Sequence, residues 1–233
     1  MTEIHLGFGR DLSVPSVRGE AHLLIAELQH RIKNLHAVIH ALASHSLKGD
    51  LPLAEAREVF VGRLEALARI DQRLIDAAWK GTSLNDLVRS ELKPYAGRIK
   101  IEGPDVILDA QSAQNFALAL HELATNASKY GALDGSDGTV SIDWAFTANA
   151  NGKHLKFNWR ERGGPPVTMP EQTGFGTSLV RATLDGGHFE YSAEGLTYEA
   201  SIPYAMVAPS QSAPQSPPGE TPTAFHSEPT QRG

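Results

Sequence analysis

A row of polar side chains interrupts an otherwise apolar stretch in the middle of the chain. Glu122, Asn126 and Lys129 stand at i, i+4 and i+7, so on a helix they share one face. An amide oxygen suits Mg²⁺, a carboxylate can hold the waters of the metal, and an ammonium group can pair with phosphate oxygens. Buried structural hydrogen bonds would explain the row equally well. The row therefore indicates a metal and phosphate site only in combination with other segments.

A carboxylate followed by two glycines is the second such segment. Glu161 ends a strand-like run that includes Trp159, and Gly163 and Gly164 come next. The carboxylate could accept a hydrogen bond from the amino group of adenine, and the glycines would let the backbone approach the base closely. We therefore expect Trp159, Glu161 and both glycines at a nucleotide.

A second glycine-containing turn precedes an expected helix. It consists of Gly174, Gly176 and Thr177, with Phe175 between the glycines. The backbone N–H groups at the start of a helix could bind phosphate. A Gly-x-Gly turn is weak evidence alone, because many turns need glycine. Its position after the other two segments supplies the specificity.

His30 is the candidate acceptor of a phosphoryl group. On a helix it lies about 160–200° around from Leu28 and Ile32, which places the imidazole away from the apolar side. A neutral imidazole nitrogen is a nucleophile near pH 7, and Arg31 and Lys33 could neutralise incoming phosphate oxygens. Position alone favours a solvated helix face with an idle histidine. The assignment of His30 therefore depends on the nucleotide site.

Two antiparallel helices are expected to carry His30. Apolar residues recur at alternating spacings of four and three from Ala21 to Leu42, which is the pattern of a coiled-coil seam. The segment 48–52 interrupts the pattern with Gly and Pro, and a second helical run extends from Phe60 to Leu74. A lone hairpin buries too little to be stable. We expect a second copy to complete a four-helix bundle, with the rest of the chain as the alternative.

The segment 82–206 mixes strands with helices. Asn151 and Gly152 predict a hairpin turn. Successive strands with short turns, without strict alternation with helices, favour an antiparallel or mixed sheet that helices cover on one face. The expected fold class is α+β. The expected strands are Ile99–Glu102, Val106–Leu108, Thr139–Phe146, His154–Arg160, His188–Ser192 and Thr197–Ile202, and the expected helices are 83–95, 110–131 and 175–184.

The composition excludes several classes of protein. A formal net charge of -6 argues against a general nucleic-acid binder. The absence of cysteine excludes disulfides, thiolate metal sites and cysteine nucleophiles. No apolar run is long enough to span a bilayer, so we expect no membrane contact and a cytoplasmic protein. The expected organisation is a flexible leader at 1–17, a helical hairpin at 18–80, a catalytic domain at 81–206 and a disordered Pro/Ser-rich tail at 207–233.

At these residues the chain resembles the HWE family of bacterial sensor histidine kinases. These are relatives of the gyrase–chaperone–kinase–mismatch-repair (GHKL) ATPases. The similarity runs from about Leu23 to Pro203. The letters that name the family match His121, Trp159 and Glu161. The matching segments are ELQHRIKN around His30, EAREVFVGRLEALARID in the second helix, HELATNASKYGAL, and NWRERGGPPV followed by GFGTSLV.

The resemblance implies a fold, two cofactors and a reaction. The fold is a two-helix dimerisation and phosphotransfer unit followed by an α/β-sandwich ATPase domain of the GHKL (Bergerat) type. The cofactors are ATP and Mg²⁺: Asn126 binds the metal, Glu122 and Lys129 support metal and phosphates, and Glu161 binds adenine. His30 is phosphorylated, and the phosphoryl group then passes to an aspartate in the receiver domain of a response regulator.

Three features depart from related kinases. His30 is followed by an arginine where many histidine kinases have an acidic residue that serves as base, which leaves Glu27 as a guess for that role. Only about ten residues separate Gly164 from Gly174, so we expect a compact or open nucleotide pocket without a long lid. No sensor domain precedes Ala21, so we expect any input to come from a separate sensor protein.

Two alternative functions stay open from the residues. One is a histidine phosphotransferase that relays phosphate and keeps a vestigial ATPase domain. The other is a related ATPase or serine kinase that phosphorylates an external protein without His30.

Overall fold

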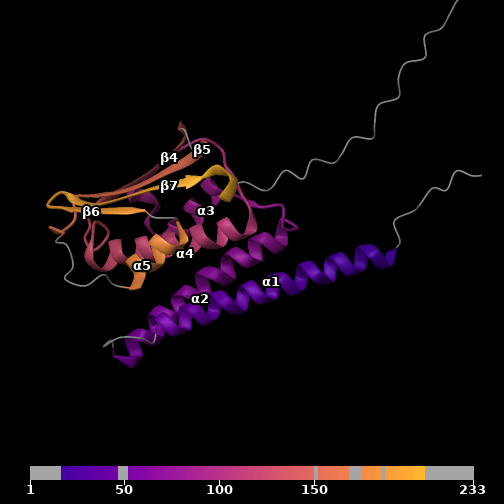
Figure 1. Ribbon diagram of the computed structural model, residues 1–233. Helices are drawn as coiled ribbons and strands as arrows, with labels where there is room; N and C mark the ends of the chain where they lie inside the picture. The colour runs from indigo at the N-terminus through magenta and orange to yellow at the C-terminus, as the bar shows by residue number, and fades with distance from the viewer. Residues whose placement is uncertain (1–16, 47–51, 150–151, 168–174, 185–186, 208–233) are drawn as a thin grey trace, which may run out of the picture.

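Two long helices, α1 (Val17–Ser46) and α2 (Leu53–Asp76), form an antiparallel hairpin in the computed structural model of the protein (Figure 1). The hairpin prediction is confirmed. The structure describes residues 17–46, 52–149, 152–167, 175–184 and 187–207; the predicted leader up to residue 16 and tail from 208 lie outside it. Within these ranges, the side chains at 17–24, 27, 30, 31, 45, 149 and 175 also lie outside the description.

The apolar seam of α1 is covered along only part of its length. Leu42 is buried at 1% exposure, and Leu35 and Ile39 pack against the core of the rest of the chain. Nearer the N-terminal end, Leu28 is 57% and Ile32 52% exposed. The rest of the chain thus completes the C-terminal half of the seam and leaves the preceding part bare.

A five-stranded sheet of order β2-β4-β5-β7-β6 forms the upper layer in Figure 1. β2 pairs with β4 in parallel, and the other three pairings are antiparallel. The prediction of a mixed sheet is confirmed. A separate two-stranded sheet of β1 and β3 adds a short strand, β1, that has no counterpart among the predicted strands. The strands are β1 (Thr82–Ser83), β2 (Ile99–Glu102), β3 (Ile107–Leu108), β4 (Thr139–Asn149), β5 (Gly152–Arg162), β6 (His188–Ser192) and β7 (Gly195–Pro203).

The predicted hairpin between β4 and β5 is present. Gly152, one of the two predicted turn residues, is the first residue of β5 and pairs with Asn149. Residues 150–151 lie outside the described part. The φ angle of Gly152 is +107°, a value that only glycine adopts without strain, and this explains why a turn signal occurs beside the turn.

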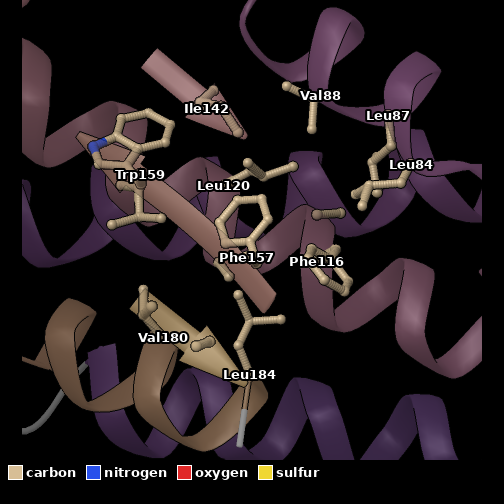
Figure 2. Packing of buried hydrophobic residues seen from close by; sticks show 14 of the residues in the cluster. Leu84, Leu87, Val88, Phe116, Leu120, Ile142, Phe157, Trp159, Val180 and Leu184 are labelled. Atoms are coloured by element: carbon tan, nitrogen blue, oxygen red, sulfur yellow. The ribbon is translucent and has the colours of Figure 1, made fainter. Parts of the chain in front are cut away.

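Helices cover one face of the sheet (Figure 1), as predicted. Figure 2 shows Phe116 and Leu120 of α4 beside Phe157 of β5, with Val180 of α5 below them. Along β5, every second side chain points into this core, which follows from the two-residue period of a strand. The helices are α3 (Leu84–Glu91), α4 (Ala110–Tyr130) and α5 (Phe175–Thr183), with two 3-10 helices, η1 (Lys93–Arg98) and η2 (Tyr204–Met206).

The inner face of α2 belongs to the same core as the sheet and α4. Leu67, Ile70 and Leu74 are all at most 2% exposed and join one hydrophobic cluster with residues of α3, α4 and β5. At the other end, Val207, the first residue of the predicted tail, is buried, and its carbonyl accepts a hydrogen bond from the N–H of Asp109. The predicted α+β class is confirmed. In the ranges that the structure covers, no helix is both long and apolar enough to cross a membrane.

Candidate functional site

The helix α4 carries the polar row predicted from the sequence. Asp109 caps the helix, because its Oδ1 accepts a hydrogen bond from the N–H of Ser112 at 2.8 Å. Exposure increases along the row: Glu122 is buried, Asn126 is half-buried and Lys129 is exposed. The row therefore begins inside the protein and ends at its surface.

Arg63 of α2 holds the buried end of the row. Its Nε and Nη2 donate to Oε1 and Oε2 of Glu122 at 2.7 and 2.8 Å, which is a bidentate ion pair. Its Nη1 donates to the Oγ of Ser46, the last residue of α1, at 2.7 Å. All three residues are at most 5% exposed, so solvent and salt screen the pair little. Glu122, predicted to support the metal, thus has a cationic partner from the hairpin.

Arg63 is not among the residues that the sequence predicts for the site, although its spacing from the apolar residues of α2 indicates that it is buried. Arg63, Leu67, Ile70 and Leu74 follow one another at spacings of four, three and four, so a guanidinium stands in the apolar face of α2. A charge at a buried position needs a partner of opposite sign. The sequence could not identify that partner as Glu122, which is 59 positions away.

The first turn of α5 lies directly against the row. A Cβ added to Gly176 would fall 2.4 Å from Oε2 of Glu122 and 3.7 Å from Nδ2 of Asn126. Gly176 is the second residue of α5 and Thr177 the third, so their N–H groups are among those that a helix leaves without an internal partner. Such groups can bind an anion. Of the three predicted phosphate-binding residues, Gly176 lies against the row, Thr177 follows it in the first turn of α5, and Gly174 lies outside the described residues.

Glu161 is enclosed by donors from two elements. Its Oε2 accepts the N–H of Ala132, just after α4, at 2.9 Å, and its Oε1 accepts the indole N–H of Trp159 at 3.0 Å. The side chains of Trp159 and Glu161 point to the same face of β5 because they are two residues apart. Burial raises the pKa of the Glu161 carboxyl, while the N–H groups of Ala132 and Trp159 oppose the rise. The carboxylate is thus oriented, and 1% exposed.

The glycines after Glu161 let the chain turn so that it lies against the residues that follow α4. Gly163 has a φ of +75°, in the left-handed region that favours glycine. A Cβ on Gly164 would lie 2.5 Å from the Cα of Ala132. Gly164 is thus packed against the backbone at the end of α4, and the close approach of its backbone to a base stays a prediction. The fully buried Trp159 contacts Glu161 and supports its orientation.

These contacts order the predicted residues along α4. Glu122 and Gly176 lie near its middle, and Glu161 lies beyond its C-terminal end at Ala132. About 14 Å of helix rise separates Glu122 from Gly131, the residue before Ala132. A ligand with an anionic end and a base-like end would find suitable groups at the two ends of this span.

The residues present fit a magnesium ion that takes most of its ligands from water and phosphate. Among the residues that the structure covers, no three carboxylate, histidine or cysteine side chains cluster as a ready metal cage. Mg²⁺ does not need one, since it usually takes one or two protein oxygens and completes its shell with water and phosphate. Asn126 is half-buried beside Glu122 and Gly176, and its amide forms no hydrogen bond with another described residue. Its oxygen is available for this role.

His121 faces α2 instead of the row. A Cβ added to Gly62 would lie 3.1 Å from its Nε2, so a glycine in α2 makes room for the imidazole. Burial is the main cause that lowers the pKa of His121, and a neutral ring fits this contact. His121 also lines a cavity of about 620 Å³ together with Arg69, Glu91, Lys93, Tyr95 and Thr125.

His30 and the polar row lie at different levels of the hairpin. His30 is in α1, and its side chain is outside the described part. Ser46 contacts Arg63, which contacts Glu122, so the row lies beside the C-terminal end of α1. From His30 to Ser46 the helix rises by about 24 Å. The structure therefore does not bring the predicted acceptor to the predicted phosphate site. The side chains of Glu27 and Arg31 are also outside the described part.

Comparison with known proteins gives a family match over the hairpin and the start of the sheet region. Residues 27–105 match the model of the HWE histidine kinase family. The blue-light-activated histidine kinase of Brucella anthropi is 31% identical over 190 residues, which are 78% of this chain and 39% of that protein. A protein of the same name from Brucella ovis matches at the same identity and coverage. The chain thus spans 39% of the length of these curated relatives.

A solved structure shows the same fold. The Erythrobacter litoralis EL346 blue-light activated histidine kinase has a TM-score of 0.53 and 19% identity, over 78% of this chain and 59% of that one. At this identity the likeness concerns the fold alone.

Proposed function

Because the chain belongs to the HWE histidine kinase family, we propose that it binds Mg²⁺ and ATP and transfers the γ-phosphoryl group to His30. The observation that carries the proposal is the arrangement along α4. Glu161 would accept the adenine amino group, Asn126 would hold Mg²⁺, and the first turn of α5 together with Lys129 would bind phosphates. A nucleotide lying along α4 would have its base at Glu161, beyond the C-terminal end of the helix, and its phosphates near Asn126 and Gly176.

The chemistry required of the chain is mainly positioning and charge stabilisation. Phosphoryl transfer needs the nucleophile in line with the leaving oxygen and cations on the phosphate oxygens. Bound Mg²⁺ neutralises charge on the phosphates. A ring nitrogen of His30 forms a bond to the γ-phosphorus while the bond to the β–γ bridging oxygen breaks, which leaves ADP and a phosphoramidate. The nitrogen that attacks must be unprotonated, as an imidazole largely is near pH 7.

We extend the proposal to the next step and to the partners. A phosphoramidate transfers its phosphoryl group readily, so an aspartate in the receiver domain of a response regulator would accept it. The bare stretch of α1 around Leu28 and Ile32, 57% and 52% exposed, supports a second copy as partner of the hairpin. Since ATP is the donor, we place the reaction in the cytoplasm. The input would come from a sensor that is either covalently attached or separate.

The test is labelling with γ-³²P-ATP. We expect acid-labile, alkali-stable label on the wild-type chain and none on His30→Gln. The matched control is His36→Gln, since His36 is an exposed histidine of the same helix. Equal labelling of His30→Gln would overturn the acceptor assignment. Acid-stable label would favour a serine kinase, and absence of ATP binding would favour a relay protein with a vestigial ATPase domain.

A further inference from the structure

We propose that Arg98 is a positioning residue for the adenine end of the nucleotide, because it holds the loop whose Ala132 N–H orients Glu161. The inference rests on the proposed function and adds a residue to its base-binding part. Arg98 is half-buried at the end of η1. Its Nη2 donates to the carbonyl of Leu133 at 3.1 Å, and its Nη1 donates to the carbonyl of Gly135. Both carbonyls belong to the loop between α4 and β4.

The register of the sheet brings Arg98 and Glu161 to the same edge. Ile99 of β2 pairs with Val140 of β4, and Val140 pairs with Glu161 of β5. Arg98 directly precedes β2, and the loop that it contacts directly precedes β4. Because β2 and β4 are parallel, their N-terminal ends lie side by side. A guanidinium placed just before β2 therefore meets the loop just before β4.

Arg98 ties the loop to a second element. On the side of α4, the N–H groups of Gly131 and Leu133 both donate to the carbonyl of Ala127, at 3.1 and 2.8 Å. Arg98 instead binds carbonyls of the loop and joins them to η1. A guanidinium is a rigid fork, so two bonds from it fix the direction of the backbone that they hold. Ala132 lies between Gly131 and Leu133, and its N–H is thus held in place from α4 and from η1.

The loop in turn controls the direction and the protonation of Glu161. Its Oε2 accepts the N–H of Ala132 at 2.9 Å, and this N–H opposes the rise that burial causes in the pKa of the carboxyl. The other oxygen is held by Trp159 of the same strand, which does not depend on the loop. Without Arg98 the bond from Ala132 weakens, and the pKa of Glu161 rises further. Arg98 thus acts on base binding through Ala132 and Glu161.

The first experiment compares Arg98→Met with Arg89→Met by isothermal titration with ATP between pH 5 and 8.5. Arg89 is the matched control, because it is an exposed arginine that bonds Asn85 within α3. We expect Arg98→Met to bind ATP about 3- to 10-fold more weakly at pH 7.5, the factor that one hydrogen bond contributes. Its affinity should also begin to decline at a higher pH than that of wild type, because more of Glu161 is protonated.

Two further comparisons separate this role from a general loss of structure. The loss of affinity should be equal in Mg²⁺ and in EDTA, since the base end does not contact the metal. Arg98→Lys keeps the charge and can reach one carbonyl, so its affinity should lie between those of wild type and Arg98→Met. Arg89→Met should bind as wild type does. Wild-type binding by Arg98→Met, or weaker binding with an unchanged pH profile, would overturn the proposal.

The second experiment needs no nucleotide. Hydrogen exchange of the Ala132 amide, followed by NMR, reports how often its bond to Glu161 opens. We expect this amide to exchange about 10-fold faster in Arg98→Met than in wild type or Arg89→Met, since the bonds removed come from a charged donor. Unchanged exchange would overturn the role of Arg98 alone. Absence of ATP binding to the wild-type chain would overturn the proposed function, and the role of Arg98 in base binding with it.

Discussion

The indole N–H of Trp159 donates a hydrogen bond to Oε1 of Glu161, 3.0 Å away and two residues further along the same strand. The spacing Trp-x-Glu therefore has a structural meaning, because alternate side chains of a strand share a face. The second oxygen of Glu161 is held by the N–H of Ala132 at 2.9 Å. A carboxylate fixed by two donors is ready to accept a third hydrogen bond from a base.

Nucleotide affinity should depend on the ionisation of Glu161. Burial raises the pKa of its carboxyl above the ordinary value, and only the ionised form has both oxygens free of a proton. As the pH falls from 8 to 5, ATP affinity should therefore decline earlier than an ordinary glutamate would dictate. Titration calorimetry across this range would measure it. The Glu161→Gln variant should bind ATP weakly and without this dependence, and an equal decline in that variant would exclude Glu161 as the cause.

The same group predicts how stability changes with pH. A carboxyl whose pKa is higher in the folded than in the unfolded state holds its proton more tightly when folded. Its contribution to the free energy of unfolding is thus largest below the unfolded pKa and declines as the pH rises through the folded pKa. Urea unfolding of wild type and Glu161→Gln between pH 4.5 and 8 should show wild type losing stability relative to the variant as pH rises. A difference that does not vary with pH would contradict the raised pKa.

Asn126 should be required for the metal-dependent part of ATP binding. Replacing it with alanine removes the amide oxygen proposed for Mg²⁺, so we expect Mg²⁺·ATP affinity to fall about 10- to 100-fold. ATP affinity in EDTA should change little. Asn115→Ala is the control, since Asn115 is also a half-buried asparagine of α4 and accepts a hydrogen bond from the exposed Gln111. Equal losses with and without Mg²⁺ would mean that Asn126 contacts the nucleotide directly.

Gly176 should tolerate no side chain. An alanine there would place its Cβ 2.4 Å from Oε2 of Glu122, so either α5 or the carboxylate must shift. We expect loss of Mg²⁺·ATP binding and a loss of about 1–3 kcal/mol in the free energy of unfolding, typical of overpacking. Gly135→Ala is the control because no atom lies within 4 Å of the added Cβ. Wild-type binding by Gly176→Ala would show that α5 does not contribute to the site.

Periodicity predicted most of the fold, because burial of an apolar face dictates local structure. The strands Ile99–Glu102 and His188–Ser192 have the bounds that the alternation of apolar and polar residues predicts. The strand β1 is two residues long and has no period to detect, and its existence depends on pairing with β3. The short 3-10 helix η1 replaces the end of the helix expected at 83–95, since Pro94 prevents a continuous α-helix there.

The candidate site was predictable only where its residues are local in sequence. The row on α4 follows from helical spacing, and the pair Trp159 and Glu161 follows from strand spacing. The contact between Arg63 and Glu122 joins residues 59 positions apart. Its existence depends on how α2 packs against α4, which spacing within either helix does not determine. The sequence can show that Arg63 needs a partner, and only the packing shows which one.

The hydroxyl of Ser46 should stabilise the hairpin through Arg63. Ser46→Ala removes the acceptor of the bond from Nη1, 2.7 Å long, which a buried charged group makes inside the protein. We expect a loss of about 1.5–3 kcal/mol in the free energy of unfolding, measured by urea denaturation. Ser136→Ala is the control, since this exposed serine donates a hydrogen bond to its neighbour Asp137 and should change stability by less than about 0.5 kcal/mol. Equal effects of the two substitutions would contradict the role of Ser46.

The bare part of α1 should govern self-association. Ile25, Leu28 and Ile32 are each more than half exposed, and they continue the seam that packs inside the chain from Leu35 onward. A second copy that covers them would bury three large apolar side chains, each contributing about 1.5–3 kcal/mol when fully buried. Analytical ultracentrifugation should therefore show a dimer for wild type and a monomer for Leu28→Glu. Leu53→Glu, at a residue that is 78% exposed outside the seam, should remain dimeric. A monomeric wild type would show that the seam has another occupant, and phosphorylation of His30 would then have to proceed within one chain.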